Sequence, residues 1–134
     1  MPNTRSGPRA SAANAAGDDM NAWHFEWLGL LAFEDPLRPS VRAAVMQARE
    51  AGISVKVITG DAPQTALAIA REAGIIVGDE PTLLGRDIDA MDDAALAAAV
   101  RGVRVFARVS PTHKLRLVQA MQAHGDVVAM TGDG

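Results

Sequence analysis

The sequence predicts an α/β fold in which a mostly parallel, open β-sheet carries helices on both faces. Strand-like segments alternate with helix-like segments of about ten to fifteen residues, which is the pattern of βαβ units. Glycines stop the first two predicted helices, at Gly52 and Gly74, and Pro111 opens the last one. In such sheets, ligands bind outside the carboxyl ends of the strands, so the residues after Ile58, Val109 and Met130 are the ones to examine.

Composition narrows the class of protein. The chain has 134 residues, of which 49% are hydrophobic and 22% charged, and this suits one globular domain. Its net charge of -3 argues against a nucleic-acid binder driven by bulk charge. The absence of cysteine excludes disulfides and thiolate metal sites. No apolar run approaches the roughly 20 residues that span a bilayer, so we expect no membrane insertion by this segment.

The N-terminal segment differs from the rest. Residues 1–22 are small, polar and rich in Gly, Pro, Ser and Ala, which predicts a disordered leader. An amphipathic targeting segment is the alternative, and the lack of an apolar stripe disfavours it. The regular pattern begins at Trp23, so the folded domain is expected over 23–134.

The expected elements follow in chain order. A first strand is predicted over 26–33 and a first helix over 38–52. We expect Asp92 or Asp93 to cap the third helix and Ser110 to cap the fourth. The remaining expectations are a strand over 54–60, a helix over 62–74, short extended pieces over 74–85, a helix over 92–100, a strand over 103–109, a helix over 110–125 and a last strand over 126–132.

The motif TGDAP follows the strand that ends at Ile58. Thr59 offers a hydroxyl, Gly60 offers an unhindered backbone N–H, and Asp61 stands where it could cap the next helix. A helix N-terminus with free N–H groups suits a phosphate. The alternative is a capped strand-to-helix turn that binds nothing.

The motif ARVSPTHK follows the next strand. Lys114 falls in the first turn of a helix, where a cation opposes the helix dipole, and a nearby anion would offset this cost. Arg108 ends the strand and points either to the same place or to solvent. The alternative for Lys114 is a solvated side chain. For His113 we expect a structural or solvent role.

The motif TGDG follows the last predicted strand. Asp133 lies on a glycine-flanked loop, where its carboxylate could bind Mg²⁺ with phosphate oxygens completing the shell. The alternative is a polar turn. Together the three strand ends supply a hydroxyl, a cation and a carboxylate, which suits phosphoryl transfer, but no nucleophile accompanies them.

Several linked motifs resemble one family. DPLRPSV, VITGD, FARVSPTHKLRLV and VVAMTGDG, in this order and spacing, strongly resemble the phosphorylation domain of P-type cation-transporting ATPases, with the calcium-pump-like branch most similar. LLGRDIDAMDDAAL resembles the same family between the second and third motifs. The resemblance runs from about Trp23 to Gly134 and implies a Rossmann-like, haloacid-dehalogenase-like fold.

The resemblance implies roles for individual residues. Thr59 and Gly60 would hold the phosphoryl group, and Lys114 would neutralise its oxygens. Asp61 and Arg108 would lie on the nucleotide side of the site. Asp133 would hold Mg²⁺, and ATP would be the substrate of the full-length enzyme. Near the hinge toward a nucleotide-binding domain the resemblance places two further residues, Asp35 and Arg38.

The departures from the family are as informative. The family's nucleophile is the aspartate of a DKTGT motif that precedes the threonine motif, and no DKTGT occurs here. The only Asp-x-Asp element, Asp87–Asp89, follows the threonine motif, and no hydrophobic strand is expected to lead into it, so we reject it as the nucleophile. The sequence also lacks the family's transmembrane helices and stops where the family continues into VND. We therefore expect an inactive fragment, or a truncated reading frame, of a pump.

The missing nucleophile strand has a physical consequence. In the family it lies between the strands that end in TGD and TGDG, so without it these strands either pair directly or keep unpaired backbone groups. We expect marginal stability and self-association through exposed strand edges. Two alternatives remain, a non-catalytic interaction module and a soluble phosphatase of the same superfamily. A pump segment of this kind would lie on the cytoplasmic side of its membrane, and would be soluble if expressed alone.

Overall fold

The computed structural model of the chain describes residues 26–31 and 35–132. The predicted leader and Asp133 lie outside these residues, as does part of the first predicted strand. All regular secondary structure of the described ranges belongs to the unit Asp35–Gly134, which is treated by itself below.

Three parallel strands form an open sheet in this unit. They are β1 (Val57–Ile58), β2 (Thr82–Leu84) and β3 (Val105–Ala107), and their spatial order is β1-β3-β2. Val57 pairs with Val105, and Thr82 pairs with the same residue from the other side. β3 is therefore central, and its three side chains are fully buried. The predicted parallel sheet is confirmed, although β1 and β3 are shorter than expected.

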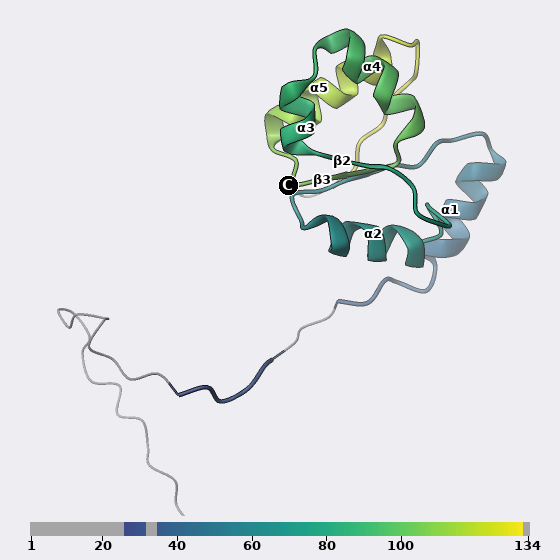
Figure 1. Ribbon diagram of the computed structural model, residues 1–134. Coiled ribbons are helices and arrows are strands. Elements are labelled where there is room, and N and C mark those ends of the chain that lie inside the picture. The colour runs from purple at the N-terminus through teal and green to yellow at the C-terminus, as the bar shows by residue number, and fades with distance from the viewer. Residues whose placement is uncertain (1–25, 32–34, 133–134) are drawn as a thin grey trace, which may run out of the picture. The chain divides into compact units, whose positions relative to one another are not determined.

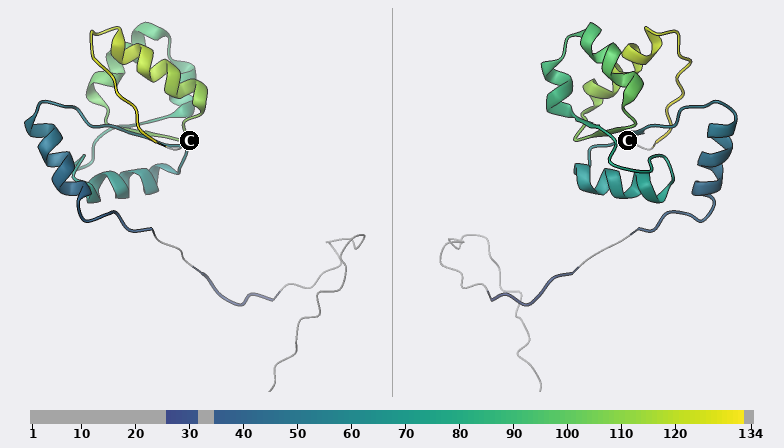
Figure 2. Two further views of the ribbon diagram at one scale, coloured as in Figure 1. Left: turned by 180° about the vertical axis from the view of Figure 1, so that it is seen from behind. Right: turned by 45° about the vertical axis from the view of Figure 1, so that its right-hand side comes forward.

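Helices cover both faces of the sheet, as predicted. Figure 1 shows α2 (Pro63–Glu72) below the strands and α3 (Gly85–Ala90), α4 (Asp93–Gly102) and α5 (Pro111–Gln122) above them, while α1 (Val41–Glu50) lies beside α2. The views in Figure 2 agree with this arrangement. Alternation along β3 divides the core, because adjacent side chains of a strand point to opposite faces. Phe106 packs with α3, α4 and α5, whereas Val105 and Ala107 pack with α2.

The helix ends follow the sequence signals. Gly52 and Gly74 adopt positive φ angles of 78° and 75°, which close α1 and α2 at low steric cost. The Asp92 carboxylate accepts a hydrogen bond from the Ala95 N–H at 2.8 Å and caps α4. Ser110 caps α5, and Pro111 is its first residue, as expected.

The helix α3 was not expected from the sequence. The expectation that no hydrophobic strand leads into Asp87–Asp89 is also wrong, because β2 ends at Leu84. The Asp87 carboxylate accepts the Leu84 N–H at 2.9 Å, so it closes the strand-to-helix turn. Asp89 is held by His113, as described below. Both carboxylates therefore have structural partners.

Two predicted strands do not form in the described residues. Residues 26–31 have no regular structure and are exposed, with Leu28 at 91% of full exposure. Residues 126–132 also have none, although Val128 packs against the core. A strand needs a ladder partner, and in residues 35–132 β1 pairs with β3 alone. Of the two outcomes expected without an intervening strand, the structure shows unpaired backbone rather than direct pairing.

Candidate functional site

The turn after β1 is closed by its own polar side chains. The Thr59 hydroxyl donates to the Asp61 carboxylate at 2.9 Å and accepts the Asp61 N–H at 3.1 Å. Asp61 does not cap α2, contrary to expectation, since the N-cap is Ala62 without a side-chain bond. The carboxylate turns back to the threonine instead. Gly60 is exposed at the tip of this turn.

The loop after β3 is joined to that turn through its backbone. The Arg108 N–H donates to the Asp61 carbonyl at 3.1 Å, and the Val109 N–H donates to the Thr59 carbonyl at 3.1 Å. Arg108 has a φ of +53°, a left-handed conformation that side chains other than glycine adopt rarely. This conformation turns the chain from β3 toward α5 and leaves the Arg108 side chain exposed.

The start of α5 carries the predicted lysine. The Ser110 hydroxyl accepts the His113 N–H at 3.3 Å, and the Lys114 N–H donates to the Ser110 carbonyl at 3.1 Å. Lys114 is half-buried in this first turn. The helix therefore begins directly after the Arg108 loop, and its first-turn cation is only a few residues from the loop that is bonded to Thr59.

The C-terminal segment returns to the same region. Figure 1 shows the chain after α5 running back along the sheet toward the edge where β2 and β3 end. Thr131 and Gly132 are exposed, and Asp133 lies outside the described residues. The predicted hinge residues Asp35 and Arg38 precede α1 and are exposed, and the Arg38 carbonyl accepts the Val41 N–H at 3.0 Å.

Sequence reasoning missed two cations that hold the fold together. The Lys56 ammonium donates to the Val100 and Val103 carbonyls at 2.8 and 2.7 Å, at the C-terminal end of α4. Burial lowers the pKa of Lys56 from 10.5, and the charge of Arg104 lowers it further, while Asp126 acts in the opposite direction. The available sequence signal was the position of Lys56 inside a predicted strand. A cation that is buried there requires hydrogen-bond partners.

Arg116 is the second missed cation. Its guanidinium on α5 donates to the carbonyls of Ile88 and Met91 at 2.8 and 2.9 Å, and to the Asp93 carboxylate at 2.9 Å. It thereby ties the junction of α3 and α4 to α5. These partners are more than twenty residues away in the sequence, so no local pattern indicates them.

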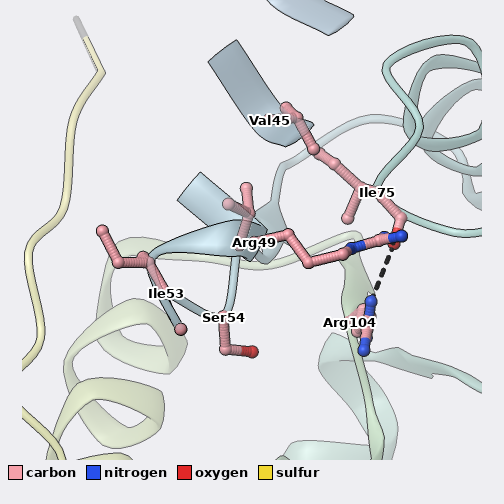
Figure 3. Close-up of a pocket in the computed structure, with 8 residues that line it drawn as sticks. Val45, Arg49, Ile53, Ser54, Ile75 and Arg104 are labelled. Atoms are coloured by element: carbon pink, nitrogen blue, oxygen red, sulfur yellow. Dashed lines mark hydrogen bonds between the residues drawn. The ribbon is translucent and has the colours of Figure 1, made fainter. Parts of the chain in front are cut away.

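A pocket of about 210 Å³ lies at the amino ends of the strands, opposite the predicted site (Figure 3). Its lining includes Ser54 and Val55 before β1, and Arg104 before β3. The Arg104 guanidinium donates to the Ile75 carbonyl at 3.1 Å, and Arg49 reaches the same oxygen at 3.2 Å. This pocket is therefore separate from the predicted site. Its two arginines donate hydrogen bonds to the backbone carbonyl of Ile75, just after α2.

No group of three or more His, Asp or Glu side chains in 26–31 and 35–132 is arranged to hold a metal ion. Within the same ranges every helix is too short or too polar to cross a bilayer.

Comparison with known proteins identifies the fold. Residues 6–134 match the family of haloacid dehalogenase-like hydrolases. The calcium-transporting ATPase type 2C member 2 of Mus musculus is 44% identical over 122 residues, which cover 91% of this chain and 13% of that protein. The type 2C member 1 protein of Homo sapiens is 43% identical over the same shares of each chain.

A bacterial relative gives the same result. The probable cation-transporting ATPase F of Mycobacterium tuberculosis is 51% identical over 110 residues, which cover 79% of this chain and 12% of the relative. The chain thus spans about 13% of the curated relatives it matches, and the resemblance to calcium-transporting P-type ATPases is confirmed. The chain belongs to the haloacid dehalogenase-like hydrolase family, in the segment that it shares with cation-transporting ATPases.

Proposed function

We propose that this chain is part of the phosphorylation domain of a P-type ATPase. The whole protein would couple ATP hydrolysis, through an aspartyl-phosphate, to cation transport across a membrane. The observation that carries this proposal is the pair of backbone bonds that joins the Thr59–Asp61 turn to the Arg108 loop, in the very segment that matches cation-transporting ATPases. The 134 residues contain no DKTGT aspartate. By itself the chain is therefore proposed to bind phosphate or nucleotide but not to hydrolyse ATP.

The site residues have distinct proposed roles. Thr59 and Gly60 hold the phosphoryl oxygens, and Lys114 neutralises their charge. Asp61 and Arg108 face the nucleotide. Two facts support this assignment. Gly60 and Arg108 are exposed at the carboxyl edge of the sheet, where ligands of open α/β sheets bind. Lys114 stands in a first helical turn, where its charge is unfavourable unless an anion is near.

Mg²⁺ is proposed to bind through Asp133. The residues that the structure describes contain no group of three His, Asp or Glu side chains that could hold a metal ion. Phosphate oxygens and water would complete the shell around the Asp133 carboxylate. Mg²⁺ commonly binds proteins in this way, through one or two carboxylates and the substrate's phosphates. A single aspartate on the TGDG loop fits that donor set. When bound, the ion would neutralise charge on the phosphoryl group.

The partners and location follow from the same proposal. ATP or phosphate is the ligand, and nucleic acid is not. The remainder of the pump covers this segment in the full-length protein, which resides in a membrane with this segment on the cytoplasmic side. Expressed alone, the segment is proposed to be soluble and to self-associate through unpaired strand edges. The unpaired backbone of residues 126–132, with Val127 fully exposed, supports the last point.

Phosphate binding by the isolated chain tests the site. In a ¹⁵N-labelled sample, millimolar inorganic phosphate with Mg²⁺ should shift the amide signals of Thr59, Gly60 and the first turn of α5. Lys114→Met should abolish the shifts. Arg101→Met, which removes the same charge from the exposed last turn of α4, should retain them. Shifts that are spread over the surface, or that survive Lys114→Met, would contradict the proposed site and favour a non-catalytic interaction module.

The genomic DNA around this coding segment tests the assignment to a pump. Codons for DKTGT upstream in frame, and for VND and membrane helices downstream, are expected. A frame without them would leave binding as the only available function.

A further inference from the structure

The side chain of His113 connects the predicted phosphate site to α3. The Ser110 N–H donates to its Nδ1 at 3.1 Å, and its Nε2 lies 2.7 Å from the Asp89 carboxylate. Because Nδ1 accepts a hydrogen bond, the neutral ring carries its proton on Nε2. The Nε2–H therefore donates a hydrogen bond to the Asp89 carboxylate. The ring is only 12% exposed, whereas the Asp89 side chain is 67% exposed, so the bond joins a largely buried ring to a solvent-accessible carboxylate.

The start of α3 is packed directly against this ring. A Cβ atom placed on Gly85 would collide with the Arg108 carbonyl oxygen and would lie 2.9 Å from two atoms of the His113 ring. Gly85 is buried, and at the other glycines of the described residues no backbone atom lies nearer than 3.7 Å to such a Cβ. The first turn of α3 therefore forms a wall against which the Arg108 loop rests.

The other side of the Arg108 loop is hydrogen-bonded to the Thr59–Asp61 turn. The amides of Arg108 and Val109 donate to the carbonyls of Asp61 and Thr59. The loop is thus held between two supports, the Thr59–Asp61 turn and α3. The left-handed conformation of Arg108 costs free energy, so it persists only while the surrounding contacts hold it.

We propose that His113 and Asp89 are positioning residues of the phosphate site. The hydrogen bond between them fixes α3 against the start of α5, and so sets Arg108 and Lys114 relative to Thr59. Neither residue touches the phosphate. The pair acts by keeping the loop in its bound conformation before the ligand arrives, which lowers the ordering cost of binding. This inference rests on the proposed function of the Thr59 and Lys114 site.

A second bond between a carboxylate and a side chain of α5 provides the matched control. The Asp93 carboxylate binds Arg116 at 2.9 Å and also joins a helix on this face to α5. Its bond in the described residues is to Arg116 and not to the Arg108 loop. Removing either carboxylate takes one α5 cross-link away, but only Asp89 supports the loop.

The test compares Asp89→Ala with Asp93→Ala in the full chain. Amide hydrogen exchange at Arg108 and Val109 should accelerate about tenfold in Asp89→Ala and stay unchanged in Asp93→Ala, relative to the exchange of Phe106 in the same sample. The dissociation constant for inorganic phosphate with Mg²⁺ should rise about fivefold or more in Asp89→Ala alone, a typical size for coupling between linked sites.

Conservative variants separate the hydrogen bond from the fold. Asp89→Asn keeps an acceptor oxygen for Nε2 and should restore both the slow exchange and the affinity. His113→Asn keeps an acceptor for the Ser110 N–H but is too short to reach Asp89, so it should behave like Asp89→Ala even if the latter fails to fold. Failure of Asp89→Asn to rescue would overturn the proposal, as would unchanged loop exchange in both Asp89→Ala and His113→Asn.

The two readouts also separate this proposal from the proposed function. Faster loop exchange without any phosphate binding by the wild type would retain the positioning pair and reject the phosphate site. Phosphate binding by the wild type, with unchanged loop exchange in the variants, would retain the phosphate site and reject the positioning pair.

Discussion

Replacing Gly85 with alanine should destabilise the protein far more than a single methyl group normally does. The added Cβ would collide with the Arg108 carbonyl oxygen, and it would lie 2.9 Å from the His113 ring. The carbonyl cannot retreat freely, because the adjacent amides of Arg108 and Val109 are bonded to the Thr59–Asp61 turn. The ring cannot retreat without losing its bonds to Ser110 and Asp89.

The magnitude follows from these two constraints. Overpacking of a tight site costs about 1–3 kcal/mol, and each hydrogen bond broken by the shift adds about 1 kcal/mol. We therefore expect Gly85→Ala to lower the free energy of unfolding by about 3 kcal/mol. The matched control is Gly102→Ala at the end of α4, where a Cβ meets nothing within 4 Å. It should be neutral or stabilise by about 0.5 kcal/mol, since alanine favours helix.

Urea denaturation followed by circular dichroism at 222 nm measures the difference. Fluorescence is a poor probe of this unit, because both tryptophans, Trp23 and Trp27, lie outside Asp35–Gly134. A loss of about 3 kcal/mol lowers the urea midpoint by about 1–3 M for a typical slope of about 1–3 kcal/mol/M. Equal midpoints for Gly85→Ala and Gly102→Ala would refute the close approach of α3 to the Arg108 loop.

Three further changes have expected outcomes. Ser110→Ala removes the hydroxyl that caps α5 and should lower the free energy of unfolding by about 1 kcal/mol. Ser40→Ala at the start of α1, where the hydroxyl makes no cap bond, should lower it little. The urea midpoints of the two variants measure the difference. Arg116→Met takes a donor away from the Ile88 and Met91 carbonyls, of which Ile88 keeps the Met91 N–H, and should cost about 1–2 kcal/mol. Asp93→Ala should cost less than about 0.5 kcal/mol because that carboxylate is 96% exposed. Burial lowers the pKa of Lys56 below 10.5, so just below that pH the unfolded chain binds more protons than the folded chain. The free energy of unfolding should therefore rise with pH in that window in the wild type relative to Lys56→Met, and parallel curves would contradict the shift.

Local chemistry made much of the fold predictable. The pattern of 38–52, 62–74, 92–100 and 110–125 predicts helices, and the structure has them at Val41–Glu50, Pro63–Glu72, Asp93–Gly102 and Pro111–Gln122. Each has a stop or start residue that acts within a few positions. Gly52 and Gly74 occupy positions that require positive φ. The alternation of these helices with β-branched segments was sufficient to predict a parallel sheet with two covered faces, because parallel strands need crossovers.

Strand pairing was less predictable, because a strand depends on a partner that the sequence does not specify. Residues 126–132 have the composition of a buried strand, yet they remain unpaired in the described structure. The helix α3 has only six residues, too few for a clear period, and it forms because β2 delivers it against His113 and Arg116.

The candidate site was predictable as a set of motifs and not as a geometry. The sequence places Thr59, Arg108 and Lys114 after strands, and parallel pairing then brings the first two together. It does not indicate that Asp61 bonds Thr59 instead of capping α2. The left-handed conformation of Arg108 also has no sequence signal, since arginine is not a residue that favours it.

The full burial of β3 has a consequence for how this protein tolerates mutation. Val105, Phe106 and Ala107 have no exposed surface and contact helices on two sides, so neither a larger nor a smaller side chain has room to adjust. In a library of random variants selected for folded protein, these three codons should be the most strongly depleted. The codon for Val127, whose side chain is fully exposed, should vary almost freely. Arg108 directly follows the least variable strand, so changes in its own side chain can be selected without altering the element that presents it.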